Sequence, residues 1–169
     1  MIKSKGLIEY ANAAALVREK SPNAKFLLCG FPDEHYDSIS EDEIKNDWFS
    51  KYGIEYLGFS SNPQESIAKG SVYVLLSYNE GTPRSVLEAM AMGRAIITTN
   101  VSGCRETVQE GRNGFLVEVK SPSSAASAMN LLLNESLRES MGKASREYCE
   151  EKFNVHEVNK TLIENMDLA

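Results

Sequence analysis

Short apolar runs alternate along this chain with segments whose apolar residues recur at helical spacing. The apolar runs predict buried strands at 25–30, 54–59, 72–76, 95–98 and 114–119. The other segments predict helices at about 6–20, 40–52, 62–70, from 83, 103–109 and 121–134, with two more helical segments after them. This alternation predicts an α/β fold, a doubly wound, Rossmann-like parallel sheet with flanking helices, in a single domain.

Polar residues mark where several of these helices begin. Ser40 with Glu43 three residues later has the pattern of a capping box. Asn62-Pro63 and Ser121-Pro122 each place a helix-starting polar residue before a proline. At the helix that follows the third strand, we expect Thr82 to be the cap and Pro83 to be the first helical residue.

The stretch from Ser77 to Met90 joins the third strand to this helix. Because the first N–H groups of a helix have no partner within it, such a junction favours an anionic ligand. Two carboxylates bracket the junction, Glu80 in the loop and Glu88 in the helix. Carboxylates repel a phosphate, so beside one they are suited to accepting hydrogen bonds from hydroxyls, as on a sugar and a ribose.

These residues resemble a known family. Glu80-x7-Glu88, the segment at 89–100 and then Gly103-Cys104-Arg105-Glu106 are similar to the donor-binding domain of glycosyltransferase family 4, which consists of retaining enzymes of GT-B architecture. The similarity runs from about Lys5 to the C-terminus. It implies a bacterial hexosyltransferase of the surface-polysaccharide type, acting without a cofactor or a metal.

The resemblance also implies the substrates. The donor is a nucleotide-diphosphate sugar. The Gly-Cys-Arg-Glu variant and Asn100 resemble bacterial surface-polysaccharide and lipid-linked oligosaccharide transferases, and this resemblance implies a UDP-hexose or UDP-N-acetylhexosamine. The implied acceptor is a saccharide or a lipid-linked saccharide. The implied location is the cytoplasm, with association of the full-length enzyme with the inner face of the membrane left open.

Two residues are candidates for catalysis by this resemblance. Glu80 would contact the transferred sugar, and Lys5 of the Lys5-Gly6 pair would bind the diphosphate and stabilise the departing nucleotide. A solvated loop glutamate and an ordinary surface lysine are the plain alternatives.

The other candidates would bind the donor. Glu88 would accept hydrogen bonds from the ribose, and Gly81 and Thr82 would present backbone N–H groups to the sugar or diphosphate. Pro83, Arg84 and Ser85 form the first turn of the helix, where Arg84 either neutralises phosphate or is simply exposed. Three more candidates lie after other strands. Gly30 would approach the nucleotide, and Phe59 and Ser60 lie where the family holds the base with backbone groups and an apolar wall.

Composition narrows the classes of function. The chain has 169 residues, 42% of them hydrophobic, and a net charge of -6, which disfavours a general nucleic-acid surface. It has no apolar stretch of the roughly 18–20 residues that a membrane-spanning helix needs. Cys29, Cys104 and Cys149 are interpreted as reduced thiols, and His35 and His156 lack a catalytic or metal-binding pattern.

One feature departs from the family pattern. The chain starts at a helix, where the family has a central strand ending in an Arg, and it lacks the acceptor-binding amino-terminal half. We therefore expect residues 1–169 to be one truncated nucleotide-sugar-binding domain, inactive by itself. We also expect a gap or rearranged pairing between the strands at 26–29 and 72–76, with unpaired backbone that promotes association.

Other functions remain as alternatives. One is a nucleotide-sugar-binding module without activity of its own, and another is a different GT-B enzyme such as a sugar-nucleotide epimerase. A dinucleotide-dependent oxidoreductase is disfavoured, because the strand ending at Gly30 is followed by Phe31-Pro32-Asp33 and not by a glycine-rich fingerprint.

Overall fold

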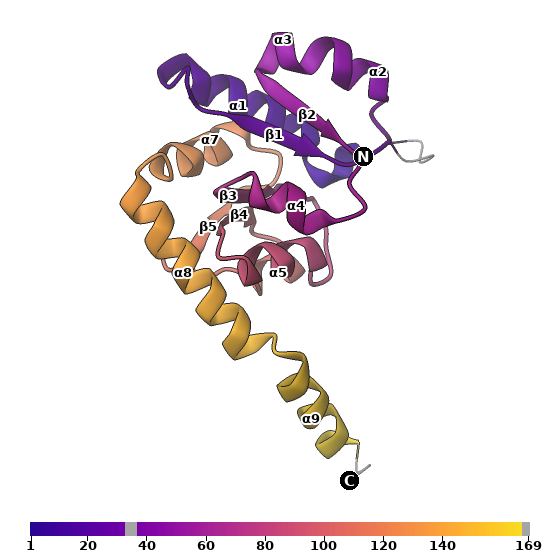
Figure 1. Cartoon of the computed structure of the whole chain (residues 1–169), viewed down its shortest axis with the longest axis vertical. Helices are drawn as coiled ribbons and strands as arrows, with labels where there is room; N and C mark the ends of the chain where they lie inside the picture. Colours follow the sequence, from indigo (N-terminus) through magenta and orange to yellow (C-terminus); the bar gives the residue numbers. More distant parts are fainter. Residues whose placement is uncertain (33–36, 167–169) are drawn as a thin grey trace.

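The structure, a computed structural model, describes residues 1–32 and 37–166 of the chain (Figure 1). The strands lie close to their predicted positions: β1 (Phe26–Cys29), β2 (Ile54–Gly58), β3 (Val72–Leu75), β4 (Ala95–Thr99) and β5 (Gly114–Val117). The helical segments are η1 (Lys3–Lys5), α1 (Leu7–Lys20), α2 (Glu41–Glu43), η2 (Ile44–Trp48), α3 (Phe49–Tyr52), α4 (Pro63–Ala68), α5 (Arg84–Ala91), α6 (Ser102–Arg105), α7 (Pro122–Leu131), α8 (Glu135–Lys152) and α9 (Val155–Asn165).

The strands form two parallel sheets. In the first, β1 pairs with β2 so that Phe26 lies opposite Ile54. In the second, the order is β3-β4-β5, with Val72 opposite Ala95 and Ile96 opposite Gly114. Within the described part of the chain no ladder joins β1 to β3, so the expected interruption between these two strands is confirmed.

Helices cover both faces of the β3–β5 sheet because its side chains alternate between two hydrophobic clusters. On β4, Ala95 and Ile97 pack into a cluster with α1 and α7, whereas Ile96 packs into a second cluster with α5 and α8. Figure 1 shows α1 and α5 on opposite sides of this sheet, while α9 extends away from the body of the molecule. The predicted doubly wound α/β arrangement is therefore confirmed.

Three of the predicted helix starts are confirmed by their capping hydrogen bonds. The side chains of Ser40, Asn62 and Ser121 accept from the backbone N–H groups of Glu43, Gln64 and Ser124, respectively. The helical segment after Ser40 reaches Tyr52 as predicted, although its middle, η2, is wound as a π-helix.

The start of α5 differs from the prediction. The helix begins at Arg84, Pro83 occupies the cap position with extended ψ of 113°, and no side chain caps the helix. Thr82 is thus one residue too early to be the cap. The Val86 N–H donates to the Pro83 carbonyl at 3.0 Å. Because the proline side chain has no hydrogen-bond acceptor, the N–H groups of Arg84 and Ser85 are left for another partner.

The helix predicted at 103–109 is also wrong in its extent, since α6 covers only Ser102–Arg105. The buried Asn113 side chain explains the early end. It accepts from the Gln109 N–H at 2.7 Å and donates to the Thr107 carbonyl at 3.0 Å, which holds this segment in a turn. No helix among the described residues is long and apolar enough to cross a membrane.

Candidate functional site

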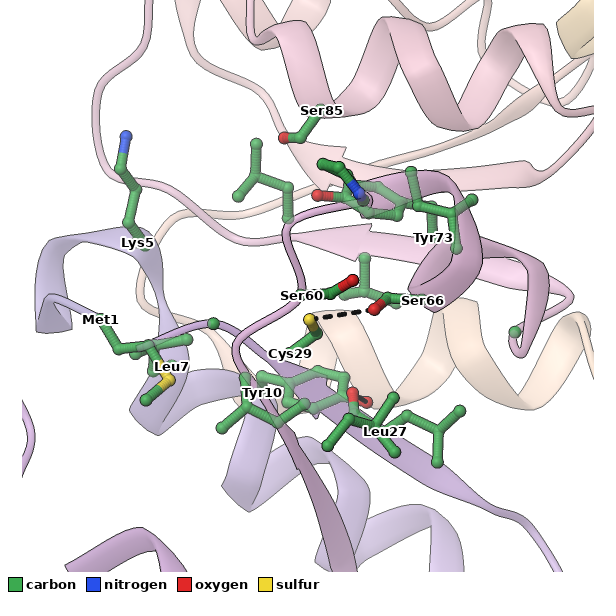
Figure 2. Close-up of a pocket in the computed structure, with 18 of the residues that line it drawn as sticks. Met1, Lys5, Leu7, Tyr10, Leu27, Cys29, Ser60, Ser66, Tyr73 and Ser85 are labelled. Carbon is green, nitrogen blue, oxygen red and sulfur yellow. Dashed lines mark hydrogen bonds between the residues drawn. The ribbon is translucent and has the colours of Figure 1, made fainter. Parts of the chain in front are cut away.

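A cavity of about 440 Å³ lies between the two sheets, bounded by the facing sides of β1 and β3. Figure 2 shows Lys5 and Ser85 at one end of it and Tyr10 and Leu27 at the other. Six of the residues predicted from the sequence line this cavity: Lys5, Gly30, Phe59, Ser60, Ser85 and Glu88. The structure therefore brings together residues that are up to 83 positions apart in the chain.

Lys5 and Glu80, the two catalytic candidates, form an ion pair. The Lys5 Nζ and the Glu80 Oε1 are 2.5 Å apart, and the Ser77 hydroxyl donates to the same Oε1 at 2.8 Å. The Glu80 side chain is 15% exposed and the Lys5 side chain 41%. One charge is thus largely shielded from water, while the ammonium remains accessible to a ligand.

Backbone contacts hold Lys5 in this position. Gly6 adopts a left-handed φ of 75°, and a Cβ added to it would lie 2.1 Å from the Leu76 carbonyl oxygen. The Tyr78 N–H donates to the Ser4 carbonyl at 2.9 Å. The turn that carries Lys5 therefore packs directly on the chain leaving β3, which explains how Lys5 reaches Glu80.

The loop that carries Glu80 rests on α6. A Cβ added to Gly103 would lie 1.9 Å from the Gly81 carbonyl oxygen and 2.6 Å from that of Glu80. On the other side of the loop, a Cβ added to Gly81 would meet no atom within 4 Å. The absence of a side chain at Gly103 thus allows the loop to pack directly on α6. Gly81 faces open space where a ligand can approach.

The first turn of α5 continues from this loop. Gly81 and Thr82 are exposed, Pro83 is buried, and the Arg84 side chain is 92% exposed with its Nη2 4.0 Å from the Glu88 Oε1. Glu88 is 34% exposed. Burial raises the pKa of Tyr73 above its usual value, although a side-chain hydrogen bond with Ser85 acts in the opposite direction.

The carboxyl ends of β1 and β2 bring Gly30, Phe59 and Ser60 to the same cavity. The Gly30 N–H donates to the Gly58 carbonyl at 3.0 Å. Phe59 is 65% exposed, so it is not a core residue. The Ser60 hydroxyl donates to the Asn62 carbonyl at 2.7 Å and stabilises the turn before α4.

Arg105 and Glu106, adjacent in the sequence and opposite in charge, each pair with another residue. The Arg105 Nε donates to Asn100 Oδ1 at 2.6 Å, and Glu106 pairs with Lys152 at 2.7 Å. The neighbouring charges diverge because Glu106 faces the end of α8, a contact that spacing alone does not reveal. His35 lies outside the described residues, and His156 is exposed on α9.

Sequence reasoning missed residues that position others. Ser77 is fully buried and anchors Glu80, while Thr99 donates to the Ser77 carbonyl at 2.5 Å. A serine at the end of an apolar strand, three residues before a candidate carboxylate, was the available signal. For Gly103 the sequence carries no signal of the contact, because it depends on how α6 approaches the loop.

Taken together, the geometry suits binding of an anion and of hydroxyl groups. It provides an accessible ammonium, a helix start without a side-chain cap, and two carboxylates. Nucleophilic catalysis by Cys104 is disfavoured, because burial raises the pKa of its thiol. Among the residues outside 33–36 and 167–169, no cluster of acidic, histidine and cysteine side chains could hold a metal ion.

Comparison with known proteins places these observations in a family. The family model for glycosyl transferases group 1 matches residues 1–148. An N,N'-diacetylbacillosaminyl-diphospho-undecaprenol alpha-1,3-N-acetylgalactosaminyltransferase of Campylobacter jejuni is 32% identical over 140 residues, which cover 82% of this chain and 35% of that protein. The capsular polysaccharide biosynthesis glycosyltransferase CapM of Staphylococcus aureus is 30% identical, covering 90% of this chain and 40% of CapM. The chain thus spans well under half the length of these relatives.

Solved structures share the fold. A mutant of S. aureus TarM, in a complex that includes UDP, superimposes with a TM-score of 0.85 at 22% identity over 97% of this chain and 33% of TarM. Anabaena HepE in complex with UDP and glucose gives 0.81 at 18% identity over 100% of this chain and 46% of HepE. The C-terminal domain of the group 1 protein LpcC from Francisella tularensis gives 0.76 at 25% identity, covering 92% of this chain and 83% of that domain.

Proposed function

The chain belongs to the glycosyl transferases of group 1, and from that premise we propose that it is the donor-binding domain of a retaining glycosyltransferase of family 4. Its donor is a nucleotide-diphosphate sugar, a UDP-hexose or UDP-N-acetylhexosamine. The full-length enzyme transfers the sugar to a polysaccharide or to a lipid-linked oligosaccharide. The acceptor contacts belong to another domain.

One observation carries this proposal, namely that Lys5, Glu80 and the start of α5 meet at the carboxyl end of β3. The Lys5 ammonium pairs with Glu80 at 2.5 Å, and Lys5 lines the same cavity as Glu88. In a parallel α/β sheet, ligands bind beyond the carboxyl ends of the strands. A positive charge and a helix start at this edge favour a diphosphate.

Each residue then has a defined task. Lys5 and the amides at the start of α5 stabilise the negative charge that develops on the departing nucleotide diphosphate. The hydrogen bonds from Lys5 and Ser77 to the Glu80 carboxylate both end on Oε1, so Oε2 accepts from a hydroxyl of the transferred hexose. Glu88 accepts from the ribose hydroxyls, and Gly81 allows the sugar to approach the backbone closely.

The relatives support this choice of substrates. The Campylobacter relative is named for transfer of N-acetylgalactosamine to a diphospho-undecaprenol-linked sugar, and the HepE structures contain UDP, glucose or UDP-glucose. The likeness to an isolated C-terminal domain of LpcC supports a single donor-binding domain. These names describe the relatives, and we infer by similarity that this chain binds a donor of the same class.

The experiment is a calorimetric titration of the chain with UDP, GDP and NAD. We expect saturable UDP binding that Glu88→Ala weakens at least about tenfold, because a charge-assisted hydrogen bond to the ribose is lost. Glu139→Ala, which removes an exposed glutamate from α8, is the matched control and leaves UDP affinity unchanged. Tight NAD binding, or UDP binding indifferent to Glu88→Ala, would contradict the proposal.

A binding module without activity remains the second candidate, because the chain spans only 35% of the Campylobacter relative and 40% of CapM. A transfer assay with the full-length protein separates the two. Retained anomeric configuration in the product supports the enzyme, and UDP binding without any transfer supports the module.

A further inference from the structure

We propose that Phe31 is a further donor-binding residue, whose ring forms with Phe59 a stacking surface for the nucleobase. This inference rests on the proposed function, because it assigns a contact within the same donor site. The sequence predicts Phe59 at the base, whereas no sequence pattern indicates Phe31.

Phe31 and Phe59 meet at the edge where β1 and β2 end. Cys29 lies opposite Gly58 in the ladder, so the residues that follow these two strands are neighbours. Gly30 has φ of 148° and Gly58 φ of 75°, backbone conformations that glycine adopts without strain. These two glycines turn the chain out of the sheet, and each is followed by a phenylalanine that leaves the core.

The two rings form a pair outside the hydrophobic core. Their centroids are 5.1 Å apart, and their planes are 89° apart, an edge-to-face arrangement. Phe31 is 57% exposed and Phe59 is 65% exposed. An edge-to-face pair cannot cover the faces of both rings, so a planar ring face remains open to a ligand.

The position of the pair in the cavity identifies that ligand. Both phenylalanines line the cavity that also contains Lys5 and Glu88. If the diphosphate lies at Lys5 and the ribose at Glu88, the base is the remaining part of the nucleotide. A base is planar and aromatic, and it stacks on phenyl rings without needing a hydrogen-bond pattern.

The backbone beside Phe31 is fixed by a hydrogen bond, and the charged residues of the cavity favour a base over an acyl chain or an apolar peptide. The Tyr56 hydroxyl donates to the Gly30 carbonyl at 2.8 Å, which fixes the backbone immediately before Phe31. This hydrogen bond therefore fixes the backbone that carries the Phe31 ring. A purely apolar ligand would leave Lys5 and Glu88, at the same cavity, without a ligand group to contact.

The test compares nucleotide affinity with affinity for inorganic pyrophosphate, which has no base. We expect Phe31→Ala to weaken UDP binding about tenfold, within the range for loss of one base–aromatic stack, and to leave pyrophosphate binding unchanged. Leu131→Ala, which shortens a 53% exposed side chain on α7, is the control and alters neither. Circular dichroism confirms that each variant is folded.

A second variant reports stacking directly. Phe31→Trp keeps a ring at this position, so we expect UDP affinity within about twofold of the unaltered chain and quenching of the new tryptophan's fluorescence by UDP. The chain's own tryptophan, Trp48, is only 1% exposed and serves as the constant background.

The possible failures are distinguishable. Absence of UDP binding by the unaltered chain overturns the proposed function and this inference together. UDP binding that Phe31→Ala leaves unchanged, or that falls in parallel with pyrophosphate binding, overturns the role of Phe31 alone. UDP binding without fluorescence quenching in Phe31→Trp also overturns the role of Phe31 alone.

Discussion

Replacing Gly103 with alanine tests how α6 supports the loop that carries Glu80 and Gly81. The added Cβ would lie 1.9 Å from the Gly81 oxygen, and real Cβ contacts essentially never fall below 3.0 Å. The loop and α6 must therefore separate by about 1 Å. Because both partners are backbone, no side-chain rotation relieves the contact.

The size of the effect follows from this geometry. Overpacking typically destabilises by about 1–3 kcal/mol, and a backbone contact belongs at the upper end of that range. About 3 kcal/mol lowers the Tm of a chain of this length by roughly 6–12 °C. We also expect UDP-sugar affinity to fall at least about tenfold, because Glu80 and the Gly81 amide move with the loop.

Gly81→Ala is the matched control, since Gly81 forms the other side of the same contact. Its Cβ would meet no atom within 4 Å, so stability changes by less than about 0.5 kcal/mol. Donor affinity still falls, because the methyl group projects where the ligand approaches. Thermal unfolding followed by circular dichroism, with calorimetry for the donor, measures both properties. If Gly103→Ala unfolds within about 1 °C of the unaltered chain, the packing described for α6 is refuted.

The remaining predictions concern the ion pair, its serine neighbour and the partly exposed phenol of Tyr78. Lys5→Met lowers the stability of the fold by less than about 1 kcal/mol, because the ion pair with Glu80 is partly exposed. The same change weakens the binding of pyrophosphate and of UDP at least about tenfold. Pyrophosphate affinity equal to that of the unaltered chain would exclude Lys5 from the phosphate site. Ser77→Ala weakens donor binding while Lys5 still pairs with Glu80, and calorimetry that finds no change would show that Ser77 does not position this carboxylate. Burial and donation to Glu9 raise the pKa of Tyr78 from 10.0 to about 12. The folded state therefore keeps this proton longer than the unfolded state, and the associated stability is fully present below about pH 10 and lost towards about pH 12. Tyr78→Phe makes the fall in stability above about pH 10 shallower in urea titrations, and an unchanged slope would contradict this assignment.

Much of the fold could be predicted because it depends on local patterns. The alternation of Ala95, Ile96 and Ile97 between two clusters follows from the period of a strand. The caps at Asn62 and Ser121 depend only on a polar side chain next to the first turn. Thr82 failed as a cap because Pro83 took that position, and a shift of one residue is beyond what a local pattern specifies.

The residues of the candidate site could be predicted from the sequence, but their placement relative to one another could not. Glu80 and Glu88 could be chosen from a motif, and Lys5 from its resemblance to the family's Lys-Gly. Their mutual placement depends on contacts between distant segments, such as Gly6 against Leu76 and Gly103 against Gly81. The pairing of Phe31 with Phe59 likewise requires β1 and β2 to be adjacent, which no single segment encodes.

The most direct test of the central claim is a crystal structure of this chain with UDP-N-acetylglucosamine. We predict the diphosphate at Lys5 and the start of α5, the ribose hydroxyls on Glu88 and the hexose beside Glu80. A nucleotide bound elsewhere, with Glu80 and Glu88 both in contact only with solvent or protein, would contradict this claim.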